Sequence, residues 1–108
     1  MIDINKFVGK PYDKEKYHCY HFVEEVLDVP KLKDVHVDTA NDDVDKYIDL
    51  FEELVQPENY CIILLGKSHI GIWYQYNIYH NDTAGVRCES ERVMRMRYNT
   101  FKYYKVKK

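Results

Sequence analysis

The sequence predicts one α+β domain, residues 1–108, in which amino-terminal helices pack on an antiparallel β-sheet. The chain has 108 residues, which is the length of a single domain. Apolar residues recur with the period of an α-helix in the first half of the chain, whereas β-rich runs separated by turn residues follow residue 60. Helices followed by consecutive strands are typical of the α+β class.

The first predicted helix runs from about Tyr17 to Asp28. Its apolar residues are spaced at i, i+3, i+4, i+7 and i+8, so they share one helix face. These residues are Cys19, Phe22, Val23, Val26 and Leu27. Pro30 ends the pattern, because proline cannot continue a helix.

A second helix is predicted from about Ala40 to Val55. Thr39 and Asp42 form an acidic variant of a capping box, and further acids in the first turn favour a helix start. The stripe expected to face the core is Val44, Tyr47, Ile48, Phe51 and Leu54. Residues 24–58 carry a net charge of −9, and we interpret most of this charge as the solvated face of the helix.

From residue 60 onwards the sequence predicts strands. The apolar run YCIILL is followed by a Gly66-Lys67 turn. The next two β-rich runs, HIGIWYQY and NIYH, are so close together that we expect a hairpin or bulge near Gln75–Asn77. A turn at Asn81–Gly85 leads to the strand VRCES, and FKYYKV forms the last strand.

The charge of the chain does not favour nucleic acid as a partner. The net charge is −2, although residues 85–108 carry +6. Because lysines alternate with aromatic residues near the carboxyl end, we interpret that segment as an edge strand whose lysines discourage pairing with other chains. Tyrosine supplies 11 of the 16 aromatic residues, which favours a cleft with polar edges.

No segment predicts export or membrane insertion. The start MIDINKFVGK lacks the apolar run of a signal peptide, and no stretch approaches the ~20 apolar residues of a membrane span. Three cysteines, Cys19, Cys61 and Cys88, are too few for a disulfide scaffold. We therefore expect free thiols and a location in the cytoplasm of a cell or on a larger particle, with no membrane partner and no cofactor.

One cysteine and two histidines occupy positions suited to nucleophilic catalysis. Cys19 lies in the first turn of the predicted helix, where the helix dipole and free N–H groups are expected to lower the pKa of its thiol. His69 begins one strand and His80 ends the next, so His80 could orient the ring of His69 through a hydrogen bond. The alternative interpretation is a small core cysteine with two structural histidines.

Two blocks of sequence resemble the NlpC-type cysteine peptidases, bacterial and phage cell-wall hydrolases of papain-like fold. The first block is Gly9-Lys10-Pro11-Tyr12 with Tyr17-His18-Cys19-Tyr20-His21-Phe22-Val23, which is similar to the family's G-x-P-Y and Y-D-C-S-G-hydrophobic-V patterns. The second is Cys61–Leu65 with Ser68-His69-Ile70-Gly71-Ile72-Trp73. The basic segment before Phe101–Val106 resembles compact phage tail-associated members.

This resemblance implies a papain-like fold and hydrolysis of an amide or peptide bond. Cys19 would be the nucleophile, His69 the general base and acid, and His80 the family's third polar residue, which orients His69. The Cys19 amide and the Tyr12 hydroxyl would form the oxyanion hole. The implied substrate is a peptide or a peptidoglycan fragment, and the implied source is a phage.

The residues around Cys19 depart from the family pattern. His18 stands where the family has Asp, and Tyr20-His21 replaces Ser-Gly. These positions and Tyr17 are expected to line the substrate cleft, so a carboxylate that would bind an ammonium group is missing. We therefore expect a specificity that differs from that of an ordinary stem-peptide hydrolase.

Two other functions fit parts of the sequence. His18, Cys19 and His21 could bind zinc together with a histidine from the strands, although Cys19 does not share a helix face with the other two, so no metal is expected. A papain-like fold without activity could instead serve as an interaction module that binds a host protein or a phage tail protein.

Overall fold

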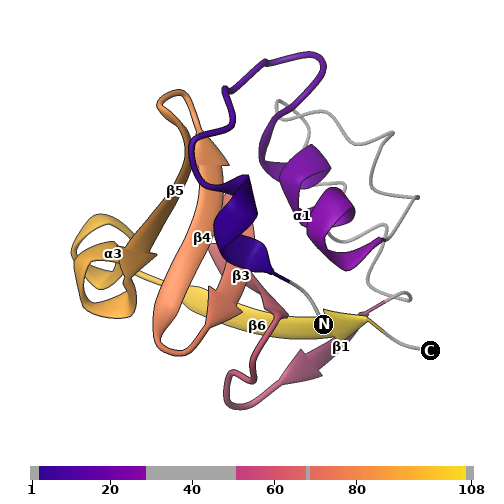
Figure 1. Ribbon diagram of the computed structural model, residues 1–108. Helices are drawn as coiled ribbons and strands as arrows, with labels where there is room; N and C mark the ends of the chain where they lie inside the picture. Colours follow the sequence, from indigo (N-terminus) through magenta and orange to yellow (C-terminus); the bar gives the residue numbers. More distant parts are fainter. Residues whose placement is uncertain (1–2, 29–50, 68, 107–108) are drawn as a thin grey trace.

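The computed structural model describes residues 3–28, 51–67 and 69–106. Within these residues the protein is α+β, with one antiparallel sheet and helical segments on both of its faces (Figure 1). The helical segments are the 3₁₀-helix η1 (Ile4–Phe7) and the α-helices α1 (Cys19–Leu27) and α3 (Glu91–Arg97). The strands are β1 (Phe51–Leu54), β2 (Cys61–Leu65), β3 (His69–Tyr74), β4 (Asn77–Asp82), β5 (Gly85–Ser90) and β6 (Phe101–Val106).

The predicted antiparallel sheet is confirmed. Its strand order is β1-β6-β2-β3-β4-β5, so four consecutive strands form a meander and β6 returns to pair with β2. The bend predicted between β3 and β4 is also confirmed. It is a two-residue turn in which Gln75 and Tyr76 both have positive φ, 49° and 65°, as a tight hairpin turn requires.

The sheet is buried on both faces. On one face α1 and η1 cover an apolar cluster, to which α1 contributes the fully buried Phe22 and Val23. On the other face Met94 of α3 packs with Trp73 and Ile78. The side chains of each central strand therefore alternate between two apolar layers, which explains why the run from Cys61 to Leu65 is apolar throughout.

The segment before α1 is hydrogen-bonded to β5, an edge strand of the sheet. The Gly9 N–H donates to the Val86 carbonyl, and the Val86 N–H donates to the Lys10 carbonyl, both at 2.9 Å. Closer to α1, the buried Asn81 side chain of β4 donates to the Tyr17 carbonyl at 2.8 Å. These bonds hold the start of α1 against β4 and β5, and the predicted first helix is confirmed with slightly shorter bounds.

Two sequence predictions are wrong at the edge of the sheet. The second helix was expected to extend to Val55, but Phe51–Leu54 forms β1, while residues 40–50 lie outside the described residues. β1 pairs with β6, so β6 lies between β1 and β2 and is not an edge strand. A strand in this position is stabilised by backbone pairing with a segment about 50 residues away, which the local apolar period does not reveal.

Helix α3 was not predicted. Ser90 accepts a hydrogen bond from the Val93 N–H at 3.2 Å and so caps the helix. Glu91 and Arg95, four residues apart, form an ion pair of 2.8 Å. Both signals are present in the sequence, but this helix has only seven residues and its apolar pattern is short.

Gly71 allows β3 and β4 to approach closely. A Cβ atom at this position would lie 2.6 Å from the Tyr79 carbonyl oxygen and 3.1 Å from the His80 Cβ. These distances are shorter than ordinary contacts, and the first neighbour is backbone, which cannot rotate away. The absence of a side chain at Gly71 is therefore a requirement of the β3–β4 pairing.

We expect Gly71→Ala to lower the free energy of unfolding by about 1–3 kcal/mol, because it overpacks a strand pair. Gly9→Ala is the matched control: its added Cβ has no neighbour within 4 Å, but its φ is +95°. That variant tests backbone strain alone, with an expected cost of about 1 kcal/mol. Urea unfolding of both variants measures the difference, and a smaller cost at Gly71 than at Gly9 would contradict the close approach.

Candidate functional site

Two histidines determine where α1 begins. The Tyr20 N–H donates to His18 Nδ1 at 3.2 Å, and the His18 N–H donates to His21 Nδ1 at 3.1 Å. This reciprocal arrangement is a capping box in which imidazoles replace the usual hydroxyl and carboxylate. His18 is only 1% exposed, so in this structure it caps the helix from a buried position. Cys19 is consequently held as the first residue of α1.

The Cys19 thiol lies at the beginning of β3. Its sulfur lies near the backbone N–H of Ile70, the residue that follows His69, and this N–H favours the thiolate. The pairing between β3 and β4 starts one residue later, at Gly71 opposite His80. β4 therefore leaves the backbone of Ile70 unpaired on its side, where the start of α1 approaches it.

The expectation of a lowered thiol pKa at Cys19 is wrong. Cys19 is 3% exposed, and burial raises the pKa of its thiol to about 11. Backbone N–H groups at Ile70, Tyr20 and Cys19 itself favour the thiolate, as the position at a helix start predicts, but their effect is smaller than that of burial. The thiol is thus protonated at neutral pH.

The two histidines of the predicted site lie together. His69 Nε2 is 2.9 Å from His80 Nδ1, and the two rings are nearly perpendicular. Their side chains share one face of the sheet, because His80 pairs with Gly71 and His69 is two residues before Gly71 on the same strand. The ring of Tyr98 stacks on His69 with centroids 6.0 Å apart.

Glu89, which is not among the predicted site residues, extends this pair. His80 Nε2 lies 2.7 Å from Glu89 Oε2, and Arg97 Nη1 lies 3.0 Å from the same oxygen. Arg87 is 3.7 Å from that oxygen and also forms an ion pair with Asp82. A weak signal was available: Arg87 and Glu89 are two residues apart on a strand that follows His80, so they share its face.

Burial keeps both imidazoles neutral. Burial, together with the smaller effect of the positive charge that His80 could carry, lowers the pKa of His69 to about 4. Burial also lowers the pKa of His80, although its hydrogen bond to Glu89 acts in the opposite direction. At neutral pH the site therefore holds an uncharged thiol and two uncharged imidazoles.

The predicted tyrosine positions differ in their environment. Tyr17 donates to Glu25 Oε1 at 2.9 Å, and burial together with this carboxylate raises the pKa of its hydroxyl. Tyr20 is 2% exposed and packs in the core, while Tyr12 is half-buried on the loop that leads to α1. The described tyrosines are spread over both faces of the sheet, so the tyrosine-lined single cleft is not found.

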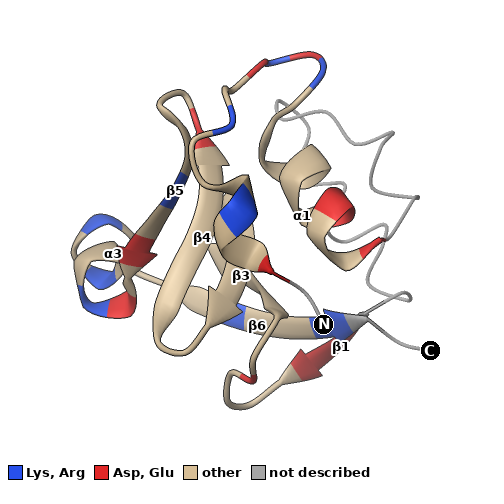
Figure 2. Ribbon diagram, viewed as in Figure 1, with Lys and Arg blue, Asp and Glu red and all other residues tan. Residues whose placement is uncertain are grey.

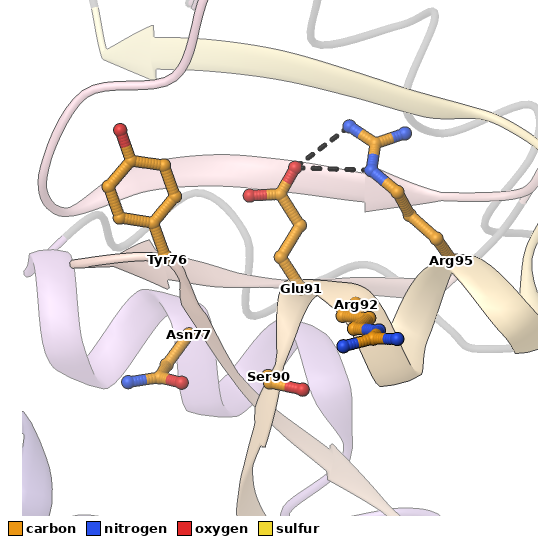
Figure 3. A pocket seen from close by; sticks show the side chains of 6 residues that line it. All are labelled: Tyr76, Asn77, Ser90, Glu91, Arg92 and Arg95. Atoms are coloured by element: carbon orange, nitrogen blue, oxygen red, sulfur yellow. Dashed lines mark hydrogen bonds and ion pairs between the residues drawn. The ribbon is translucent and has the colours of Figure 1, made fainter.

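Two surface depressions lie away from Cys19, His69 and His80. The first, of about 630 Å³, is shown in Figure 3 and is lined by Tyr76, Asn77, Ser90, Glu91, Arg92 and Arg95. Glu91 and Arg95 pair with each other there. The second, beside α1, is lined by Lys16, Tyr17, His21, Glu24, Glu25 and Asp28.

The comparisons add no family assignment. No protein-family model matches the chain, and no curated protein matches it. Within the described segments, no three His, Cys, Asp or Glu side chains are grouped so as to hold a metal ion. No helix among the described residues is long and apolar enough to cross a membrane.

The lowered pKa of His69 predicts acid sensitivity. The folded protein binds this proton near pH 4, whereas the unfolded chain binds it near pH 6.5. As the pH falls from about 6.5 to about 4, the free energy of unfolding should therefore decrease, with a contribution from His69 of up to about 3 kcal/mol.

Urea unfolding at several pH values measures this effect. Carboxylates also titrate in this range, so the informative quantity is the difference between the wild type and His69→Gln. The stability of the variant should fall less steeply over the same interval. An identical pH dependence for the two proteins would show that the folded-state pKa of His69 is not lowered.

Proposed function

We propose that this protein is a thiol hydrolase of the NlpC type, with a papain-like fold, that cleaves an amide or peptide bond. The observation that carries the proposal is the 2.9 Å contact between His69 Nε2 and His80 Nδ1. His69 directly precedes Ile70, whose backbone lies near the Cys19 thiol. A thiol at a helix start and a base that a second polar group orients are the groups that nucleophilic catalysis needs. Here they approach β3 from its two faces, Cys19 from the α1 side and His69 from the α3 side.

In the proposed reaction, proton transfer accompanies attack. His69 takes the thiol proton while the Cys19 sulfur forms a bond to the substrate carbonyl carbon. The backbone N–H of Cys19 and the Tyr12 hydroxyl stabilise the oxyanion. The carbon–nitrogen bond then breaks, and His69 returns the proton to the leaving amine. Water, deprotonated by His69, hydrolyses the thioester and restores the thiol.

This order of events follows from the charge state of the site. The pKa of the Cys19 thiol is raised to about 11 and that of His69 is lowered to about 4, so the resting pair is thiol and imidazole. A resting thiolate–imidazolium pair would place two charges where burial opposes both. His69 therefore has to act as a base during the attack itself.

The proposed substrate class is a peptide, with a peptidoglycan stem peptide as the default. The residue at position 18 supports a substrate specificity that differs from that of the family. His18 replaces a carboxylate that would bind a substrate ammonium group, and its imidazole is buried and caps α1 through Nδ1. A phage origin and a phage or host protein partner belong to the same proposal.

A second candidate function is favoured by the burial of Cys19. A cysteine that is 3% exposed, with a raised pKa, also suits a structural residue in a domain that has become an interaction module. Such a module would bind through exposed side chains, and Tyr76 and Met96 are 73% and 84% exposed near the arginines of α3. The reactivity of Cys19 separates the two candidates.

Cys61 provides an internal reference for that reactivity. It is 2% exposed and burial raises the pKa of its thiol to about 11, so it matches Cys19 in both respects but lies on β2 away from the histidine pair. If His69 activates Cys19, Cys19 should react with iodoacetamide about a hundredfold faster than Cys61 near neutral pH. The exposed Cys88 is first replaced by serine.

Mass spectrometry of the alkylated peptides gives both rates in one sample. The Cys19 rate should fall to that of Cys61 in His69→Gln, while the Cys61 rate stays constant. Equal rates for Cys19 and Cys61 in the otherwise wild-type chain would refute the hydrolase and leave the interaction module.

Cleavage of soluble peptidoglycan stem peptides tests the substrate class. The wild type should release free amines that mass spectrometry identifies, and Cys19→Ala and His69→Gln should each lower the rate by about a hundredfold or more. Cys88→Ser is the control that leaves the rate unchanged. A wild type that labels rapidly at Cys19 but cleaves no stem peptide would retain the hydrolase and exclude this substrate.

A further inference from the structure

We propose that Glu89 is a positioning residue: through His80 it fixes the ring proton of His69 on Nε2 and leaves Nδ1 of His69 as the basic nitrogen. The inference deepens the proposed function, on which its catalytic meaning rests, but it concerns a hydrogen-bond chain that exists without substrate. The chain runs from Glu89 Oε2 to His80 Nε2 over 2.7 Å and from His80 Nδ1 to His69 Nε2 over 2.9 Å.

The direction of each hydrogen bond follows from the first one. A carboxylate oxygen only accepts, so His80 must carry its proton on Nε2 in order to donate to Glu89. A neutral imidazole has one N–H, so His80 Nδ1 is then an acceptor. His69 must therefore donate from Nε2, and its own Nδ1 keeps a lone pair.

The surroundings of His80 reinforce this direction. Burial lowers the pKa of His80, which disfavours a second proton on Nδ1 that would reverse the bond to His69. Asp82 Oδ2 is 4.0 Å from His80 Nδ1, beyond hydrogen-bond distance, and it pairs with Arg87. Glu89 is thus the only carboxylate within the described residues that hydrogen-bonds to either ring.

Two arginines hold the Glu89 carboxylate in place. Arg97 comes from the last turn of α3 and lies 3.0 Å from Oε2, while Arg87, on the same strand as Glu89, lies 3.7 Å from it. Glu89 is half-buried, with a side chain 15% exposed, which limits screening of these interactions by water. Helix α3 therefore connects to the histidine pair through a charged side chain as well as through packing.

The tautomer of His69 determines which of its ring nitrogens can act as the base in the proposed reaction. Nδ1 of His69 makes no hydrogen bond within the described residues, and it is the ring nitrogen left to accept a proton from the thiol. Without the bias from Glu89, the proton shared between the two rings could equally lie on His80 Nδ1. His69 would then accept at Nε2, the nitrogen that points to His80 instead of outward.

Nitrogen-15 NMR of the imidazole rings tests the proposal without any substrate. Two-bond correlations distinguish Nδ1–H from Nε2–H tautomers, and at pH 7 both His69 and His80 of the wild type should be Nε2–H. In Glu89→Gln, which keeps the shape but loses the charge, the tautomer bias should fall by about tenfold, because charge-assisted hydrogen bonds are roughly twice as strong as neutral ones. In Glu89→Met, whose side chain has no strong acceptor, the tautomer bias should fall further.

Glu91→Gln is the matched control, because Glu91 contacts Trp73 and Arg95 but neither histidine. It should leave both tautomers as in the wild type, and circular dichroism should show that each variant folds. An Nδ1–H tautomer at His80 in the wild type, or unchanged tautomers in both folded Glu89 variants, would overturn the proposal.

The outcome is independent of the labelling experiment. Slow alkylation of Cys19 together with the expected tautomers would reject the hydrolase and retain the role of Glu89. Rapid alkylation of Cys19 with unchanged tautomers in the Glu89 variants would retain the hydrolase and reject the role of Glu89.

Discussion

The close approach of β3 and β4 at Gly71 is the constraint on which the candidate site depends. Because Gly71 has no side chain, the Tyr79 carbonyl and the His80 Cβ occupy space that a Cβ would need. His80 therefore lies against β3, within 2.9 Å of His69. The pairing ends at this residue, which leaves the Ile70 backbone to contact Cys19. The missing side chain at Gly71 thus permits the strand approach that forms the histidine pair next to the residue that Cys19 contacts.

Burial then determines the electrostatics of the site. His18 and His80 are each 1% exposed. His80 donates one hydrogen bond to Glu89 and accepts one from His69, which suits a neutral imidazole. The same burial keeps the Cys19 thiol protonated. A helix start alone would favour the thiolate, so the depth of the thiol outweighs its position on the helix.

The uneven charge of the chain is balanced locally in the carboxyl-terminal part of the fold. Figure 2 shows basic residues gathered on α3 with acidic residues beside them. Arg97 pairs with Glu89, Arg95 with Glu91, and Lys105 with Glu52 of the neighbouring strand. Much of the positive charge of residues 85–108 is therefore paired within the protein. This pairing explains the basic segment without nucleic-acid binding and without protection of a sheet edge.

The sequence by itself determined the α+β class, the first helix and the positions along the chain of the strands from Cys61 onwards, because local apolar periods and turn residues carry that information. It also supplied the candidate residues Cys19, His69 and His80. It did not reveal β1, α3, the interior place of β6 or Glu89. β1, the place of β6 and the bond from Glu89 to His80 depend on contacts between distant segments, whereas α3 is too short for its local cap and ion pair to reveal it. The tertiary structure alone decided the charge state of the thiol, because the pKa of a buried group depends on the solvent that its neighbours exclude.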